Sequence, residues 1–254
     1  MQNNNSVNFC SRSHKGKVKR NNQDSLDFDQ EYNIAVIADG IGGKDYGEVA
    51  SHLAVESCMA YLKNLDHSNE KFYETVTREL SNSIKIANES IITIQRNEPK
   101  YSNMGSTLSC FWLTPNKLYY SWVGDSRVYL INPSYETITM LTRDHTLDQS
   151  KIDPDLSPTM YKRASSILTQ MVGSILLLKP DTGSFNVNSG DIILTCTDGL
   201  SDRVPDQLIL EYAIKFNKNT PQSLEAYADK LLDRALDCGG QDNISFVLAQ
   251  TSNE

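Results

Sequence analysis

The sequence predicts an α+β fold in which antiparallel sheets are covered by helices on the outside. Three observations lead to this prediction. Two helical segments follow the first buried strand, a run of short β-rich segments comes next, and two further helices precede the last strand. Strands and helices that are grouped in this way, rather than strictly alternating, favour antiparallel sheets. With 254 residues, the chain is long enough for one large domain, and we predict a single domain over residues 1–254.

The first elements are strands and two long helices. Residues 34–38 form a continuous apolar run, which predicts a strand buried on both faces, and another strand is expected to begin beside Asp24. Apolar and small residues recur at helical spacing over residues 47–65 and again over about 71–96. Pro99 follows the second of these segments, so we expect that helix to end before it.

Short β-rich segments dominate the chain from Gly105 onward. Turn signals separate the first four of them, so we expect antiparallel strands joined by hairpins. Strands are expected at residues 106–113, 117–123, 126–132, 136–142, 192–196 and 244–250. Helical spacing predicts one helix around residues 208–216 and another that is capped by Pro221 or Ser223 and ends before Gly239.

The segment at about 146–165 has no regular pattern. Its length is that of a loop with a function of its own, and we predict a mobile flap or a small subdomain.

Charge and cysteine content exclude several classes of protein. The formal net charge of -8 argues against binding to nucleic acids or anionic membranes. The N-terminus lacks the apolar region of a signal peptide, and no apolar run is long enough to span a membrane, so we predict a cytoplasmic protein. The five cysteines are odd in number and contain no Cys-x-x-Cys pair, which predicts reduced thiols and no thiolate zinc site.

The glycine-rich stretch DGIGGKDYG, residues 39–47, does not fit the known phosphate-binding loops. A Walker loop requires glycine at position 38, which is Ala38, and a dinucleotide fingerprint requires glycine at position 45, which is Asp45. No cysteine is followed six positions later by an arginine, and no Asp-x-Asp pair has the Thr or Val of an aspartyl-phosphate phosphatase. The sequence therefore offers no visible nucleophile for a covalent phosphoenzyme.

Aspartates at the ends of strands suggest a different chemistry. Asp39 and Asp198 each follow an apolar strand, Asp125 lies on a turn expected to close a hairpin, Asp242 precedes the last strand, and Asp24 precedes an early one. If these side chains converge, they form a hard-oxygen site for Mg²⁺ or Mn²⁺. Two carboxylates 4 Å apart repel by about 4 kcal/mol, so such a cluster requires cations. A single Asp-Gly pair, however, is more often only a turn.

Several motifs occur in a fixed order between Gly16 and Leu248, namely GKVKRNNQDS, ADGIGGKDYGEVAS, GST, VGDSRVY, LTRDHT, SSILTQMVG, LTCTDGLSD and GGQDNISFVL. In this order the chain resembles the metal-dependent protein phosphatases (PPM, type 2C Ser/Thr phosphatases) in their bacterial form. The resemblance implies a sandwich of two antiparallel β-sheets flanked by helix pairs. It also implies an enzyme that hydrolyses phosphoserine and phosphothreonine in proteins and reverses the action of a Ser/Thr kinase. We further predict a monomer.

The same resemblance assigns roles to individual residues. It implies two ions of Mn²⁺ or Mg²⁺ that together activate a water for direct attack on phosphorus, and in bacterial members a third, weaker ion. The implied ligands are Asp39 as the bridge, the Gly40 carbonyl, Asp198, Asp242, Asp24 through water, and Asp125 for the third ion. Gln23 takes the place of an acidic neighbour of Asp24.

The chain departs from the family pattern at the phosphate-binding arginine, whereas Ile41 matches the apolar residue of bacterial members. Lys19 aligns with the arginine that binds substrate phosphate, and Arg20 is one place away, so phosphate binding is expected from Lys19 with Arg20 beside it. A lysine cannot supply the bidentate geometry of arginine. Ile41 replaces the histidine of eukaryotic members. His145 is either a substitute proton donor or a residue that ties its loop, and Arg127 either grips phosphate or pairs with an acid.

Two other functions stay open on the sequence alone. One is a non-catalytic or weakly active phosphoprotein-binding regulator of the same fold, and the other is a phosphatase of small metabolites. Asp39, Asp198 and Asp242 are all present, which favours catalysis.

Overall fold

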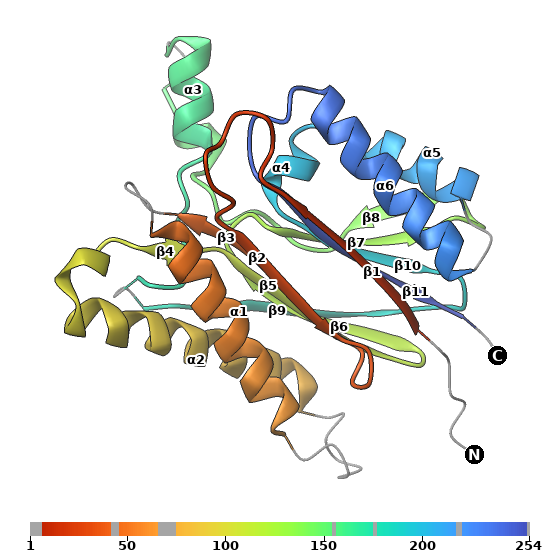
Figure 1. Ribbon diagram of the computed structural model, residues 1–254, viewed down its shortest axis with the longest axis horizontal. Helices are drawn as coiled ribbons and strands as arrows, with labels where there is room; N and C mark the ends of the chain where they lie inside the picture. The colour runs from red at the N-terminus through yellow and green to blue at the C-terminus, as the bar shows by residue number, and fades with distance from the viewer. Residues whose placement is uncertain are drawn as a thin grey trace.

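Two antiparallel β-sheets face each other, and helices cover the outer face of each sheet (Figure 1). The computed structural model describes residues 7–41, 46–65, 75–153, 156–174, 177–216 and 220–252. The first sheet contains, in spatial order, β1 (Val7–His14), β11 (Ile244–Thr251), β10 (Ile192–Cys196), β7 (Arg127–Asn132) and β8 (Thr137–Met140). The second contains β2 (Asp24–Asp29), β3 (Ile34–Ile41), β5 (Leu108–Thr114), β6 (Lys117–Val123) and β9 (Asp181–Asn186), with the short β4 (Gly105–Ser106) on β3. The predicted α+β sandwich is confirmed.

Two helix pairs complete the layers. The pair on the second sheet is α1 (Gly47–Lys63) and α2 (Val76–Asn97), and the pair on the first sheet is α5 (Asp206–Phe216) and α6 (Pro221–Asp237). Buried apolar side chains form one layer beneath each pair and a third layer between the sheets. Removal of this apolar surface from water holds the layers together. No helix in the described part of the chain is long and apolar enough to cross a membrane.

The strand β3 is buried on both of its faces, as its apolar run predicts. Ile34, Val36 and Ala38 lie in the layer beneath α1 and α2, whereas Ala35 lies in the layer between the sheets. An antiparallel strand usually alternates apolar and polar residues, but β3 cannot because helices cover one face and the other sheet covers the second. The strand is therefore a rigid support for the residues at its end.

The turn at Gly124 and Asp125 does not close a hairpin, so the sequence prediction is wrong at this point. The strands on either side of it, β6 and β7, belong to different sheets. The hairpins β5–β6 and β7–β8 are present as expected. Because the turn passes from one sheet to the other, it places Asp125 at the edge between them.

Two strands are not predicted by the sequence pattern. The strand β1 mixes polar and apolar residues, and it is held by pairing with β11 along its whole length. The strand β9 is mostly exposed and pairs with β6 at the edge of the second sheet. In both cases the partner strand, rather than an apolar alternation, stabilises the extended conformation.

The helix ends agree with the expected breaks, with one correction. The cap of α6 is Thr220, not Pro221 or Ser223: the Thr220 side chain accepts from the Ser223 N–H while the Ser223 side chain accepts from the Thr220 N–H. Beyond the end of α6, Gly239 has φ +116°, which favours glycine. The sequence predicts that α2 begins at about residue 71, but residues 71–74 lie outside the described residues.

The expected flap contains a short 3₁₀ turn, η3 (Gln149–Lys151), and a helix, α3 (Pro158–Ser165), which stands away from the two sheets (Figure 1). A bridge between Thr146 and Leu168 joins the two ends of this segment. Residues 154–155 lie outside the described residues. Two other short helices are η2 (Pro99–Tyr101), which follows α2, and α4 (Asp198–Ser201), which follows β10.

Candidate metal centre and active site

Five aspartates meet at one edge of the sandwich, where strand ends of both sheets come together. Asp24 opens β2 and is the direct cross-strand partner of Asp39 on β3. Asp198 is the first residue of α4, Asp242 is two residues before β11, and Asp125 lies in the turn that crosses between the sheets. A pocket of about 530 Å³ is lined by all of these except Asp24, which is buried beside it. The structure thus brings together the aspartates that the sequence singles out.

The backbone of Asp39 is fixed by two residues to which the sequence assigns no role. The Asp39 N–H donates to Thr107 Oγ1 at 2.8 Å, and the Asp39 carbonyl accepts from the Thr107 N–H at 2.9 Å and from Ser106 Oγ at 2.7 Å. These bonds use all the backbone groups of Asp39, so its carboxylate alone is left for the pocket. In the sequence these two residues belong to the GST motif, and the role of that motif becomes clear only from their hydrogen bonds to Asp39.

Two buried carboxylate oxygens have no hydrogen-bond partner among the described residues, namely Asp24 Oδ1 and Asp198 Oδ1. The other oxygen of Asp24 accepts from Thr197 Oγ1 at 3.0 Å. A buried, unpaired carboxylate oxygen is costly, and a cation or its bound water would satisfy it. The residues therefore fit a hard divalent cation, because every side-chain donor is a carboxylate.

Burial and crowding raise the pKa values of four of the aspartates. Burial, followed by the neighbouring aspartates, holds the pKa of Asp39 well above its ordinary value. Burial and then Asp125 and Asp242 raise the pKa of Asp198 to about 7. Burial raises the pKa of Asp24 to about 6, with repulsion from Asp242 added, and burial and Asp144 raise that of Asp125 to about 6. Negative charge at this edge is thus unfavourable until a cation balances it.

Close backbone contacts set the position of the site, and glycines allow them. A Cβ at Gly40 would collide with the carbonyl oxygen of Gly47 and lie 2.6 Å from that of Gln23. A Cβ at Gly199 would collide with the carbonyl oxygen of Asn243. The first contact presses the end of β3 against the start of α1, and the second presses Asp198 and its helix against the segment that carries Asp242.

Lys19 reaches the pocket, whereas Arg20 does not. Lys19 Nζ lies 2.6 Å from Asp242 Oδ1, and Lys19 lines the pocket. Arg20 is exposed and is not among the residues that line it. No three acidic, histidine or cysteine side chains in the described ranges are already gathered closely enough to hold an ion. The ion pair with Lys19 occupies one carboxylate oxygen of Asp242.

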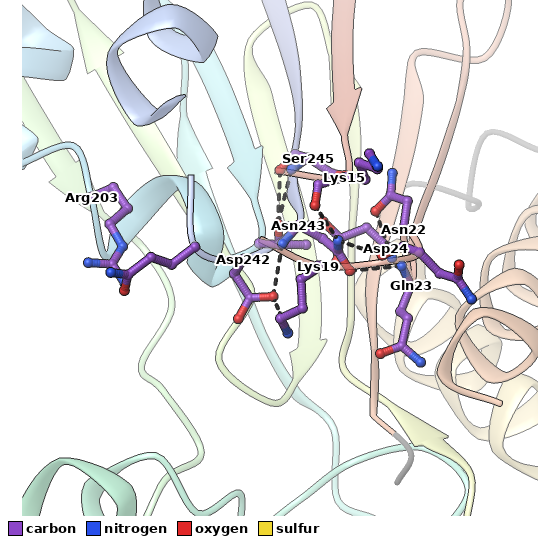
Figure 2. A network of polar contacts seen from close by, with 12 residues as sticks. Lys15, Lys19, Asn22, Gln23, Asp24, Arg203, Asp242, Asn243 and Ser245 are labelled. Atoms are coloured by element: carbon purple, nitrogen blue, oxygen red, sulfur yellow. Dashed lines mark hydrogen bonds and ion pairs between the residues drawn. The ribbon is translucent and has the colours of Figure 1, made fainter. Parts of the chain in front are cut away.

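Asn243 bonds to three backbone groups of the loop between β1 and β2, and Figure 2 shows it beside Lys15, Lys19 and Gln23. Its Nδ2 donates to the carbonyl oxygens of Lys15 and Asn21, both at 2.9 Å, and its Oδ1 accepts from the Gln23 N–H at 2.8 Å. Asn243 is buried, with 3% of its surface exposed. The side chain thereby fixes the loop that carries Lys19 beside Asp242.

Contacts near Asp125 establish the roles of Arg127 and His145, which the sequence leaves open. Arg127 makes a two-pronged ion pair with Asp144, at 3.0 and 2.8 Å, so it fixes its own turn rather than standing free for phosphate. His145 accepts from the Gly124 N–H at 3.2 Å through Nδ1, and its Nε2 lies 3.2 Å from Asp181 Oδ2. His145 therefore ties the turn that carries Asp125.

Comparison with known proteins identifies the family of the chain. Residues 11–238 match the family described as protein phosphatase 2C. The chain belongs to the protein phosphatase 2C family. The resemblance to this family seen in the sequence is thus confirmed.

Among similar proteins, the chain is 31% identical to the serine/threonine protein phosphatase PstP of Mycobacterium tuberculosis, over 95% of this chain and 44% of that protein. It is 28% identical to the serine/threonine phosphatase stp of Listeria welshimeri, over 94% of each. This phosphatase 2C chain therefore spans less than half of its mycobacterial relative and nearly all of its Listeria relative.

Solved structures support the family fold. The crystal structure of M. tuberculosis PstP/Ppp superposes with a TM-score of 0.80 at 28% identity, covering 97% of this chain and 99% of that one. The catalytic domain of PstP in complex with two manganese ions superposes with a TM-score of 0.79, also at 28% identity, covering 97% and 98%.

Proposed function

We propose that this protein is a metal-dependent serine/threonine protein phosphatase that hydrolyses phosphoserine and phosphothreonine esters with Mn²⁺ or Mg²⁺. The observation that carries the proposal is the pocket at the sheet edge, where aspartates from both sheets converge. Its relative PstP, which holds two manganese ions, supports the choice of metal. A non-catalytic regulator is not favoured, because Asp39, Asp198 and Asp242 all stand at the pocket.

Within this proposal the aspartates of the site hold the metal ions. Asp39, the Gly40 carbonyl, Asp198 and Asp242 would hold the two ions, with Asp39 shared between them, Asp24 would act through water, and Asp125 would hold a third ion. Bound ions supply a Lewis acid that makes a water nucleophilic and neutralises phosphoryl charge. The Ser106 and Thr107 bonds to the Asp39 backbone keep its carboxylate directed at the pocket.

Lys19 is the residue we assign to the substrate phosphate. Its ammonium lies at the pocket and is held by Asp242, which orients it before substrate arrives. A lysine provides a point charge without the bidentate geometry of arginine. The contribution of the exposed Arg20 to phosphate binding stays a prediction from its neighbouring position in the sequence.

Phosphate release from a phosphothreonine peptide tests the function. With Mn²⁺ present, the protein is expected to release phosphate, EDTA is expected to stop the release, and excess Mn²⁺ to restore it. An Asp39→Asn protein purified in the same way controls for contaminating phosphatases and is expected to retain less than about one hundredth of the rate. Release that survives both EDTA and Asp39→Asn would contradict the proposal.

Asn243→Ala is expected to weaken both the fold and the metal site. The substitution removes three hydrogen bonds of a buried side chain and leaves their partners unsatisfied, so a loss of about 3 kcal/mol in unfolding free energy is expected. Because these bonds position the loop beside Asp242, Mn²⁺ affinity is expected to fall about tenfold. Denaturant unfolding and Mn²⁺ titration measure the two effects.

Asn132→Ala is the matched control for this prediction. Asn132 Nδ2 donates to Asp191 Oδ1 at 2.6 Å and does not line the pocket. This variant is expected to lose stability while keeping the Mn²⁺ affinity of the unaltered protein. Equal affinities in all three proteins would show that Asn243 does not position the metal site.

We also propose a cytoplasmic location, a monomer, a single catalytic domain over residues 1–254 with a flap at about 146–165, and a Ser/Thr kinase as the source of the substrates. All five cysteines are free, and four of them are buried, which suits a reducing compartment.

A further inference from the structure

We propose that an apolar wall of the pocket binds an apolar side chain adjacent to the phosphorylated residue of the substrate. We define the apolar wall as Ile41, Ile167, Leu168 and Met171, which line the same pocket as the aspartates. The inference rests on the proposed phosphatase function and adds the class of peptide that the pocket accepts.

The exposure of the apolar wall is the first observation. Ile167 is 51% exposed and Ile41 is 38% exposed, whereas the core isoleucines of β3 are fully buried. A single exposed apolar side chain is normal on a protein surface. Here, however, four apolar residues from two distant segments border one pocket, and grouped apolar surface of this kind commonly marks a binding site.

The wall is held in place by backbone bonds on the flap side. Leu168 forms a bridge with Thr146, and the Ile167 carbonyl accepts from the Leu147 N–H at 3.0 Å. The Thr169 N–H donates to the His145 carbonyl at 2.7 Å. The residues of the wall therefore project from a fixed backbone, so little conformational entropy is lost when a ligand covers them.

The same backbone is bonded to the segment that fixes Asp39. Val172 and Ser106 exchange two backbone hydrogen bonds, at 2.9 and 3.0 Å, and Ser106 Oγ donates to the Asp39 carbonyl. On the other side, Ile41 pairs with Gly105, the residue before Ser106. The distance between the wall and the aspartates is thus set by continuous pairing rather than by a loose loop.

The occupant follows from this arrangement. A phosphoryl group at the aspartates is covalently tied to a peptide, whose extended backbone advances about 3.3 Å per residue. A neighbouring side chain therefore lies within reach of a wall that shares the pocket. A leucine there would cover exposed apolar surface, whereas an aspartate would lose water and face the carboxylates of the pocket. The pocket volume of about 530 Å³ leaves room for such a side chain beside the phosphoryl group.

Three phosphothreonine peptides of equal length test the inference, with leucine, glycine or aspartate on both sides of the phosphothreonine. The measurement is kcat/KM of phosphate release with Mn²⁺. The leucine peptide is expected to exceed the glycine peptide about tenfold, which is the lower end of the selectivity of apolar pockets, and the aspartate peptide is expected to be the poorest.

Substitutions at Ile167 test whether the apolar wall causes the preference for the leucine peptide. Ile167→Ser is expected to reduce the leucine-to-glycine ratio to less than about threefold, and Ile167→Leu to keep it near tenfold. Ile214→Ser is the matched control, because Ile214 is 38% exposed on α5 and does not line the pocket. It is expected to leave the ratio and the rates unchanged.

The outcomes separate the two proposals. Equal rates for the leucine and glycine peptides, or a ratio that Ile167→Ser does not change, would overturn the apolar wall while leaving the phosphatase function intact. Hydrolysis of none of the three peptides would contradict the proposed function and the inference together.

Discussion

Asp198→Asn is expected to stabilise the metal-free protein while it abolishes metal-dependent catalysis. At pH 8, removal of the charge is expected to raise the unfolding free energy by up to about 4 kcal/mol. Phosphate release with Mn²⁺ is expected to fall at least about 100-fold, because a direct ligand matters more than the outer residues that orient ligands. The two effects have one cause: a carboxylate that is unfavourable alone and required with metal.

The sign of the pH dependence follows from the direction of the pKa shift. The pKa of Asp198 is about 7 in the folded protein, against an ordinary value of 3.8. The folded state thus binds this proton more tightly than the unfolded state does, so the contribution of Asp198 to stability is greatest below about pH 4 and is lost as the pH rises through 7. The difference between the variant and the unaltered protein should therefore be small at pH 4 and greatest at pH 8.

Denaturant unfolding in EDTA, at pH 4, 6 and 8, measures this effect. Addition of Mn²⁺ at pH 8 is expected to raise the stability of the unaltered protein and to have much less effect on Asp198→Asn. A variant that is less stable than the unaltered protein at pH 8 in EDTA would contradict the view that these carboxylates destabilise the metal-free fold.

Gly40→Ala is expected to cost about 3 kcal/mol or more of stability and most of the activity. The added Cβ would collide with backbone atoms of Gly47 and lie close to the Gln23 carbonyl, and backbone cannot move aside as a side chain can. Separation of β3 from α1 would also shift Asp39 and the Gly40 carbonyl. Denaturant unfolding and Mn²⁺-dependent phosphate release measure the two losses.

Gly190→Ala separates this collision from the general cost of replacing glycine. Gly190 has φ +86°, so alanine is strained there by about 1 to 2 kcal/mol, but its Cβ would meet nothing within 4 Å. This control is expected to lose some stability and no activity. If Gly40→Ala proved no worse than Gly190→Ala, the close approach of β3 and α1 would not be what holds the site.

The sequence predicts best those elements whose pattern is decided by local burial. The helices α1 and α6 are evident because apolar residues repeat at helical spacing, and the strand β3 is evident because its apolar run is continuous. The strands β1 and β9 are not evident, since their extended conformation depends on β11 and β6, which are distant in sequence. The crossing turn at Asp125 is mistaken for a hairpin because turn residues do not tell which sheet the next strand joins.

In the candidate site, too, some residues can be found from the sequence and others only from the fold. The aspartates can be found from the sequence because each stands at a strand end within an ordered motif. The supporting residues Ser106, Thr107 and Asn243 cannot be given a task in this way, because their hydrogen bonds join segments far apart in the chain. The exposed Ile167 likewise gains meaning only once the pocket brings it near Asp39.

The chain crosses between the sheets at Asp125, and the aspartates of the site come from both sheets. Substitutions far from the site can therefore still disturb it. Asp39 is carried by one sheet and Asp198 follows a strand of the other, so the distance between these two proposed ligands depends on the spacing of the two sheets. That spacing is set by side chains of the middle layer such as Phe111 and Leu130, which lie outside the pocket. A conservative substitution there that moves the sheets by a fraction of an ångström should slow catalysis while the fold stays intact. The rate of phosphate release should therefore report a change in the spacing of the sheets more sensitively than the free energy of unfolding does.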